Sequence, residues 1–308
     1  MMDLFKRLRW PNLTLMAFLL LSVRYFMMAP IFGSYDLNLL LNHVDVALLT
    51  LSCMLVGAGG YLINDYYDQE ADRHNGRSLL ENPSNALRWY GILSVAGIAL
   101  GAWVGYRAGL LNLAIIHIIT TFVLWKYAES WKGVPLLGNL VVSALLGLLL
   151  FVPLVYEYIA MSVLYREAAA SARFLLYASL VYAGFAYLTN LVRELAKTAQ
   201  DLHGDTQAGY RTFAVVYGAA GTRRLSVILM LVVLLGLMLI TYQQIVQQAW
   251  YNLVYLLLAT VLPAAWALVQ LIQSKESAQF AKASLTLKWL LLGGIGSMAW
   301  FYLQLLYF

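Results

Sequence analysis

Long apolar runs, divided by short polar segments, set the pattern of this chain. The runs lie at about 12–33, 46–64, 88–106, 109–127, 136–156, 173–192, 225–243, 250–272 and 287–307. An α-helix needs about 20 apolar residues to cross the hydrocarbon core of a bilayer. A transmembrane β-barrel would show short alternating segments instead. The pattern therefore predicts an all-α, polytopic membrane protein with nine transmembrane helices, forming one integral membrane domain over residues 1–308.

Composition agrees with this interpretation and excludes several other classes. Hydrophobic residues make up 62% of the 308 residues and charged residues only 11%, whereas about 25% of a typical soluble chain is charged. Cys53 is the only cysteine, so intrachain disulfides and cysteine metal clusters are excluded. The opening MMDLFKRLRWPN is basic, but the apolar stretch behind it is too long for a signal peptide and lacks a small-residue cleavage site.

The basic residues predict an orientation. If the N-terminus is cytoplasmic, the segments on that side hold most lysines and arginines, and the opposite side holds only Arg107, Arg166 and Arg173. This bias follows the positive-inside rule, which explains the formal net charge of +5 without a nucleic-acid partner. We therefore expect a multi-pass protein of the cell (inner) membrane. Its N-terminus and the two connections at about 65–87 and 193–224 are expected to be cytoplasmic.

The first of these connections opens with the acidic stretch NDYYDQEAD, residues 64–72. Asp65, Asp68 and Asp72 share one helical face if the second predicted helix continues through the stretch, and Asn64 adds an amide oxygen. Carboxylates placed so close together repel one another unless a cation lies between them. Mg²⁺ prefers such oxygens and keeps waters or substrate phosphate oxygens as its other ligands. The alternative is a solvated acidic helix end that binds no ligand.

The second connection carries a similar pattern in NLVRELAKTAQDLHGDTQAGYRTF, residues 190–213. Glu194, Lys197, Asp201 and Asp205 line one face of a helix that is expected to end near the glycines that follow. Taken alone, the spacing also fits a salt bridge between Lys197 and Asp201, worth only a few tenths of a kcal/mol.

Two acidic faces on the same side of a membrane favour a diphosphate ligand. Each face can hold Mg²⁺, and the metal ions neutralise the charge that develops when the carbon–oxygen bond to the diphosphate breaks. Lysine and arginine can share this task, and the tail of the substrate can lie between the apolar helices. The pattern thus predicts a lipid diphosphate that is cleaved at the cytoplasmic face of the membrane.

At these residues the sequence resembles the UbiA superfamily of membrane prenyltransferases. The family's first motif, NDxxDxxxD, is matched in full by residues 64–72, and its second motif, commonly KDxxDxxGD, is matched except at Thr198. The segment after the first motif departs from the family's basic-Pro-x-Arg-Pro pattern and reads GRSLLENPSN. Smaller resemblances lie in LRWPNLTL, in KYAESWKGVPLLGNLVVSALLG and in GDTQAGYRTFAVVYG.

The resemblance implies a helical bundle around a central cavity that moves a prenyl group from a prenyl diphosphate to a lipid or aromatic acceptor with Mg²⁺. The implied metal ligands are Asn64, Asp65, Asp68, Asp72, Asp201 and Asp205, and the same aspartates are the implied catalytic residues. The implied diphosphate contacts are Asn64, Arg77, Lys132 and Lys197. The implied substrate contacts are Asn12, Tyr127 and Asn139. The form of the second motif favours a glycerol phosphate lipid or a quinone precursor as acceptor.

Several alternatives stay open at this stage. Acids at one membrane face are also found in a transporter or channel, and a related enzyme could cleave the diphosphate without transferring the prenyl group. Arg24, inside the first predicted helix, either contacts a phosphate or pairs with an internal polar group. Glu194 is a candidate general base, with a salt bridge to Arg193 or Lys197 as its alternative role.

Overall fold

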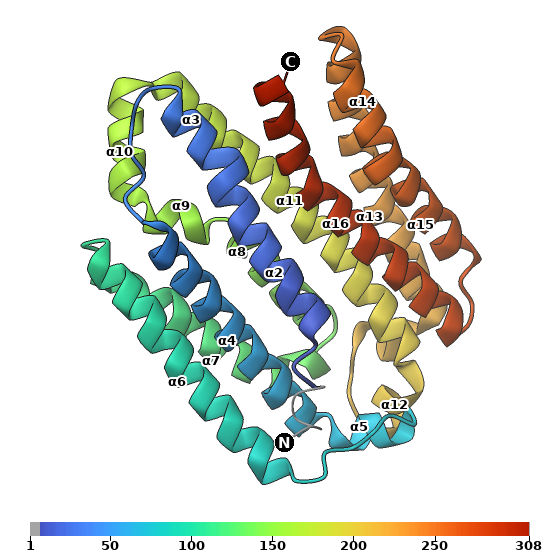
Figure 1. Cartoon of the computed structure of the whole chain (residues 1–308). Coiled ribbons are helices and arrows are strands. Elements are labelled where there is room, and N and C mark those ends of the chain that lie inside the picture. Colours follow the sequence, from blue (N-terminus) through green and yellow to red (C-terminus); the bar gives the residue numbers. More distant parts are fainter. Residues whose placement is uncertain (1–6, 308) are drawn as a thin grey trace. The chain divides into compact units, whose positions relative to one another are not determined.

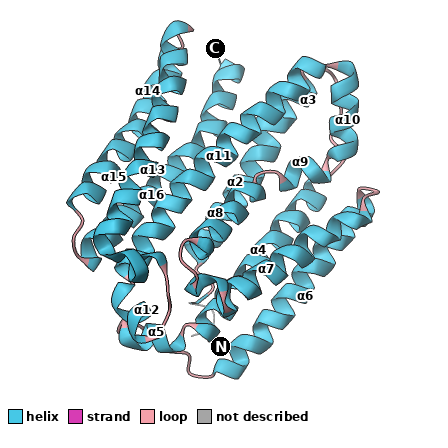
Figure 2. Cartoon of the chain, turned by 180° about the vertical axis from the view of Figure 1, so that it is seen from behind, coloured by secondary structure: helices cyan, strands magenta, loops and turns pink. Residues whose placement is uncertain are grey.

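The computed structural model describes residues 7–307, with side chains up to residue 304. In this part of the chain the regular structure is entirely helical (Figures 1 and 2). The helices are α2 (Trp10–Ser22), η1 (Val23–Met28), α3 (Ala29–Gly33), α4 (His43–Tyr67), α5 (Gln69–His74), α6 (Pro83–Arg107), η2 (Leu111–Leu113), α7 (Ala114–Glu129), η3 (Trp131–Gly133), α8 (Leu137–Leu149), α9 (Val152–Tyr156), α10 (Tyr158–Glu167), α11 (Ala169–Gln200), α12 (Leu202–Gln207), α13 (Phe213–Val246), α14 (Trp250–Leu256), η4 (Leu257–Val261), α15 (Leu262–Gln273) and α16 (Ser277–Tyr307).

Among the described residues, seven helical stretches are long and apolar enough to cross a membrane. They are Trp10–Gly33, His43–Tyr67, Pro83–Arg107, Leu111–Glu129, Ala169–Gln200, Phe213–Val246 and Trp250–Gln273. The prediction of an all-α, multi-pass membrane protein is confirmed, but the count of nine helices is not. The predicted span 136–156 is broken, because α8 has only 13 residues and Pro153 lies in the first turn of a separate short helix.

The described chain forms two compact units, and the prediction of a single domain stays a prediction. The first unit comprises Met1–Trp131 with Leu148–Leu180, and the second comprises Lys132–Gly147 with Val181–Phe308. The boundaries fall inside η3, α8 and α11, so these helices supply residues to both units.

In the first unit α4 packs against α2, α6 and α7. The α4–α6 contact is close, because a Cβ added at Gly97 would lie 2.7 Å from the Val56 side chain, and Ser52 Oγ donates to Gly97 O at 2.7 Å. Small residues at helix contacts are typical of membrane proteins, since they let backbones approach. Asn42 caps α4 by accepting from Asp45 N at 2.9 Å.

A buried ion pair lies near the start of α4 and decides the role of Arg24. Glu157 is fully buried; it accepts from Leu40 N at 2.6 Å and Leu41 N at 3.0 Å, and Arg24 Nε lies 3.4 Å from its Oε1. Arg24 also donates to Leu41 O at 2.9 Å. Of its two predicted roles, the structure therefore supports pairing with an internal polar group.

In the second unit α13, α15 and α16 run side by side (Figures 1 and 2). A buried cluster joins Val192, Ala196 and Ala199 of α11 to Phe280 and Leu287 of α16. Ser277 Oγ, at the start of α16, donates to Gln200 O at 2.8 Å. The end of α11, where the second acidic motif begins, is therefore held by α16.

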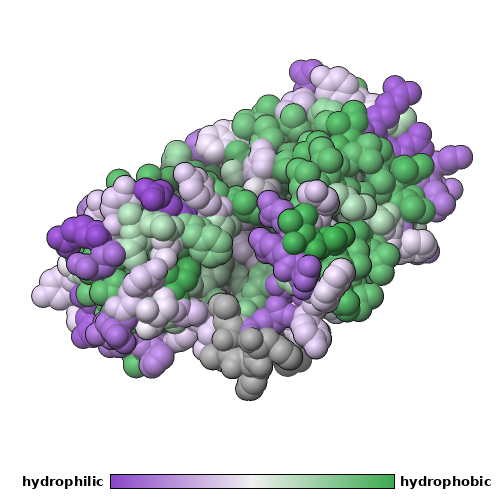
Figure 3. All heavy atoms as spheres, turned by 90° about the horizontal axis from the view of Figure 1, so that it is seen from above, coloured by the Kyte–Doolittle hydropathy of each residue, from purple (hydrophilic) through white to green (hydrophobic). Residues whose placement is uncertain are grey.

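Many large apolar side chains are exposed on these helices. Examples are Val95, Phe174, Leu235 and Trp289, each more than 60% exposed. Figure 3 shows hydrophobic residues over much of the visible surface, with hydrophilic residues gathered in separate patches. An exposed apolar surface of this extent is expected where helices face lipid rather than water.

Candidate functional site

The first acidic motif forms a helix end, a bend and a short helix. The continuous helix that would place the three aspartates on one face is not present, because α4 ends at Tyr67 and Asp68 adopts φ −85° and ψ 3°. The chain resumes as α5, in which Asp72 N donates to Asp68 O at 2.8 Å. Gly76 then turns the chain at φ +67°, a conformation that favours glycine, and Arg77 N donates to Asp72 O at 2.9 Å.

The second motif repeats this local geometry. Helix α11 ends at Gln200, and Asp201 adopts φ −91° and ψ 4°. In α12, Asp205 N donates to Asp201 O at 3.0 Å. Gly209 turns the chain at φ +73°, and Tyr210 N donates to Asp205 O at 2.9 Å. Both motifs thus follow the spacing Asp-x3-Asp-x3-Gly, and each spacing gives the same backbone turn.

Each turn presents a pair of carboxylates separated by one helical turn, a spacing at which side chains are neighbours. Asp68 is only 5% exposed and Asp205 only 2% exposed. Asn64 Nδ2 donates to Asp68 Oδ2 at 2.6 Å, so the structure brings these two predicted residues together. Buried carboxylates require a compensating cation or several hydrogen bonds, and both turns are therefore candidate cation-binding elements.

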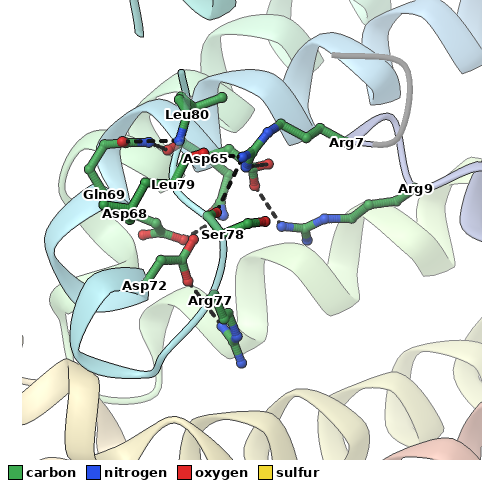
Figure 4. Close-up of polar contacts among 11 residues, drawn as sticks. Arg7, Arg9, Asp65, Asp68, Gln69, Asp72, Arg77, Ser78, Leu79 and Leu80 are labelled. Atoms are coloured by element: carbon green, nitrogen blue, oxygen red, sulfur yellow. Dashed lines mark hydrogen bonds and ion pairs between the residues drawn. The ribbon is translucent and has the colours of Figure 1, made fainter. Parts of the chain in front are cut away.

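Asp65 lies between two arginines of the N-terminal segment (Figure 4). Arg9 Nη2 lies 2.8 Å from Asp65 Oδ1, and Arg7 Nη1 lies 3.5 Å from Asp65 Oδ2. Arg9 also stacks over the Tyr61 ring, with 5.0 Å from Cζ to the ring centroid. Burial opposes the charge of Arg9, but the carboxylates of Asp65 and Asp68 outweigh it and raise the pKa of Arg9 above its ordinary value.

The loop behind the first motif is tied back to it at three points (Figure 4). Arg77 Nη1 lies 3.2 Å from Asp72 Oδ1. Leu80 N donates to Gln69 Oε1 at 3.3 Å. Arg7 donates to Ser78 O at 3.2 Å and also to Leu79 O. The segment that replaces the family's proline-rich pattern therefore has a defined conformation, and it places Arg77 beside the motif.

The predicted cations of the second unit lie around its motif. Lys132, on η3, stands over the Tyr210 ring with 5.7 Å from Nζ to the ring centroid. Lys197 Nζ lies 3.0 Å from Glu194 Oε1, and Arg193 Nη1 lies 2.9 Å from the same oxygen. The salt-bridge role predicted as the alternative for Glu194 is therefore confirmed.

The three predicted substrate contacts are spread along the chain. Asn12 lies in the first turn of α2. Tyr127 lies in the last turn of α7, and Asn139 is 7% exposed in α8. Their role in binding substrate stays a prediction.

Sequence reasoning did not assign a site role to Arg7 or Gln69. In the sequence, Arg7 is one of the basic residues near the N-terminus that indicate the orientation, and Gln69 occupies a variable position of the motif. No spacing rule links residue 7 to residues 65 and 79, so the sequence holds no signal that would have identified this contact.

The residues of the two turns fit Mg²⁺ by their chemistry. The candidate ligands are hard oxygens, and two of the carboxylates are almost fully buried. Among residues 7–307, no three acidic, histidine or cysteine side chains are placed to hold one metal ion, because Asp65 points to arginines while Asp68 and Asp72 follow the bend. Two protein carboxylates per turn suit an ion that takes its remaining ligands from water and phosphate.

Comparisons with known proteins agree with this geometry. The profile described as the UbiA prenyltransferase family matches residues 27–292. The chain is 32% identical over 188 residues to the digeranylgeranylglyceryl phosphate synthase of Methanopyrus kandleri, and this match spans 60% of the chain and 62% of that relative's length. It is 31% identical over 215 residues to the synthase of the same name from Methanothrix thermoacetophila, covering 66% of the chain and 69% of the relative.

A solved structure shares the fold. It is described as a UbiA homologue from Archaeoglobus fulgidus bound to DMAPP and Mg²⁺, and it covers 95% of this chain and 98% of its own, with a TM-score of 0.54 and 14% sequence identity. At this identity the likeness shows the fold alone.

Proposed function

The chain belongs to the UbiA prenyltransferase family, and from this premise we propose that it transfers a prenyl group from a prenyl diphosphate to a glycerol phosphate lipid, with Mg²⁺ as cofactor. The relatives named digeranylgeranylglyceryl phosphate synthase support this class of acceptor over a quinone precursor or another aromatic compound. They also suggest geranylgeranyl diphosphate as donor and geranylgeranylglyceryl phosphate as acceptor.

The observation that carries the proposal is the repeated aspartate turn. Asp68 with Asp72, and Asp201 with Asp205, lie in turns of the same backbone geometry, each closed by a glycine at positive φ. An isolated acidic helix end would give no reason for the same bend and the same turn to occur twice. Two equivalent turns with buried carboxylates are expected where a chain binds two divalent cations.

In the proposed reaction, Asp68 and Asp72 hold one Mg²⁺ and Asp201 and Asp205 hold another. Bound Mg²⁺ supplies Lewis-acid stabilisation of the negative charge on the leaving diphosphate. Arg77 beside the first turn, and Lys132 and Lys197 in the second unit, would each add fixed positive charge for a diphosphate bound at their own turn. That the two turns serve a single diphosphate stays a prediction. The metal-binding role predicted for Asp65 competes with its pairing to Arg7 and Arg9, and the Mg²⁺ requirement of Asp65→Asn distinguishes the two roles.

Transfer also requires that the acceptor hydroxyl lose its proton. Glu194 is a poor candidate for the base, because its carboxylate is already engaged by ion pairs with both Arg193 and Lys197. We therefore expect the proton to pass to another group or to the departing diphosphate.

The test is an assay of the purified protein in lipid nanodiscs. It contains geranylgeranyl diphosphate, geranylgeranylglyceryl phosphate and Mg²⁺, and mass spectrometry follows the transferred product while diphosphate release is measured in parallel. We expect product and diphosphate in equal amounts, and no turnover in Asp68→Ala or Asp201→Ala. Diphosphate without product would show a diphosphatase, and ion flux in liposomes without either would show a transporter. Wild-type rates in both variants would overturn the metal assignment.

A further inference from the structure

Arg7 connects three parts of the first unit. Its guanidinium lies against Asp65, at the end of α4, and donates to the carbonyls of Ser78 and Leu79 in the loop behind the motif. Its side chain is only 9% exposed. A buried arginine that donates to backbone carbonyls while paired with a carboxylate is held in one orientation, because the planar guanidinium directs its donors along fixed lines.

The second motif shows that the turn itself needs no carboxylate at the position of Asp65. Asp68 N donates to Asn64 O at 3.0 Å, and Asp201 N donates to Lys197 O at 2.9 Å. Asp65 and Thr198 therefore occupy the same place in their motifs, one residue after these acceptors. Thr198 Oγ1 donates to Leu195 O at 2.8 Å and leaves no charge at this place. Because both turns have the same backbone, the carboxylate of Asp65 is not needed to form the turn. We infer that it serves the contact with Arg7 instead.

We propose that Arg7 is a positioning residue for the prenyl diphosphate site, anchored on Asp65 and fixing residues 77–80 so that Arg77 stands beside Asp72. The inference rests on the proposed function for its substrate and on the contacts of Figure 4 for its geometry.

The reason why Arg77 needs such support is its exposure. The Arg77 side chain is 44% exposed, and its ion pair with Asp72 lies partly in water, where such pairs hold a side chain only weakly. A long cation on a mobile loop would lose much conformational freedom when it binds an anion. Holding the backbone of Ser78 and Leu79 removes part of that loss before the substrate arrives, which favours binding of the diphosphate.

The experiment compares Arg7→Ala, Arg7→Lys and Asp65→Asn with wild type in nanodiscs. Arg73→Ala is the matched control, because Arg73 is an exposed arginine of α5 close to the same loop. Hydrogen exchange of amides 77–81 is measured first, without Mg²⁺ or substrate. We expect faster exchange in Arg7→Ala and Asp65→Asn, partial recovery in Arg7→Lys, and wild-type exchange in Arg73→Ala. The double variant Arg7→Ala/Asp65→Asn should exchange no faster than the faster single variant.

The kinetic arm then separates positioning from metal binding. Arg7→Ala should raise KM for geranylgeranyl diphosphate about tenfold, the size expected when hydrogen bonds of a charged group are lost, with little change in kcat. The Mg²⁺ concentration for half-maximal activity should stay that of wild type in Arg7→Ala and in Asp65→Asn.

Two results would overturn the proposal. One is unchanged exchange of residues 77–81 in Arg7→Ala. The other is a higher Mg²⁺ requirement in Asp65→Asn, equal to that of Asp72→Asn, which would make Asp65 a metal ligand. Hydrogen exchange needs no substrate, so it tests the Arg7 contact even if the protein transfers no prenyl group. A lack of prenyl transfer by the wild-type protein would count against the proposed function and not against the role of Arg7.

Discussion

Gly293 of α16 lies close against the backbone of η4, and its replacement by alanine is expected to destabilise the second unit. A Cβ at Gly293 would lie 2.0 Å from the carbonyl oxygen of Ala259 in η4. Carbon and oxygen normally approach to about 3.3 Å, so α16 and η4 would have to separate locally by roughly 1.3 Å. The obstacle is backbone, and Gly293 O also accepts from Tyr255 OH at 2.9 Å, so neither partner can move without losing other contacts.

The magnitude follows from two opposing terms. Overpacking of this kind costs up to about 3 kcal/mol, whereas alanine is favoured over glycine inside a helix by about 1 kcal/mol. We therefore expect Gly293→Ala to lower the free energy of unfolding by up to about 2 kcal/mol. Gly236→Ala in α13 is the matched control, because a Cβ there meets nothing within 4 Å, and it should be neutral or stabilising by up to about 1 kcal/mol.

Thermal unfolding in detergent, followed by circular dichroism, measures this difference. Gly293→Ala should melt several degrees below Gly236→Ala. Since α16 holds the end of α11 through Ser277 and Gln200, the Mg²⁺ requirement of Gly293→Ala should also rise near its melting temperature. Equal melting temperatures for the two variants would refute the packing argument.

Three further predictions concern the candidate site and its supports. EDTA should abolish prenyl transfer and added Mg²⁺ should restore it, whereas activity that survives EDTA would argue against metal-held diphosphate. Gly76→Ala and Gly209→Ala should each cost about 1 kcal/mol of stability through strain at positive φ and should raise the Mg²⁺ requirement to a similar extent, as measured by activity at graded Mg²⁺; a change in only one would contradict the equivalence of the turns. Glu194→Gln should lower the melting temperature, because it removes the ion pairs with Arg193 and Lys197, but it should keep the shape of the pH–rate profile. Loss of one limb of that profile would identify Glu194 as the base.

Much of the fold could be predicted from apolar run length alone, because a helix in lipid must satisfy all its backbone groups internally. Errors arose where local chemistry overrides the run. Pro153 begins a separate short helix and thereby splits the fifth predicted span. A hydropathy window averages over such single residues and does not register them.

The candidate site was predictable only in part, for a similar reason. Spacing along the chain placed Asp68, Asp72, Asp201 and Asp205 in two acidic motifs, but it implied continuous helices where the structure has bends. The contact of Arg7 with Asp65 could not be predicted, since it joins residues far apart in sequence. Local patterns carry information about turns, whereas ion pairs between distant segments depend on how the helices pack.

The two turns also explain how the chain can depart from the family pattern at Thr198. The bend at Asp201 and the glycine turn at Gly209 are made by residues 201–210, and position 198 lies one helical turn before the bend. A change there leaves the backbone that presents Asp201 and Asp205 intact. In the first motif the same position holds Asp65, whose carboxylate pairs with Arg7 and Arg9. We therefore expect the carboxylates at and after each bend to bind the divalent cation, whereas the position before the bend serves the neighbouring loop in the first motif.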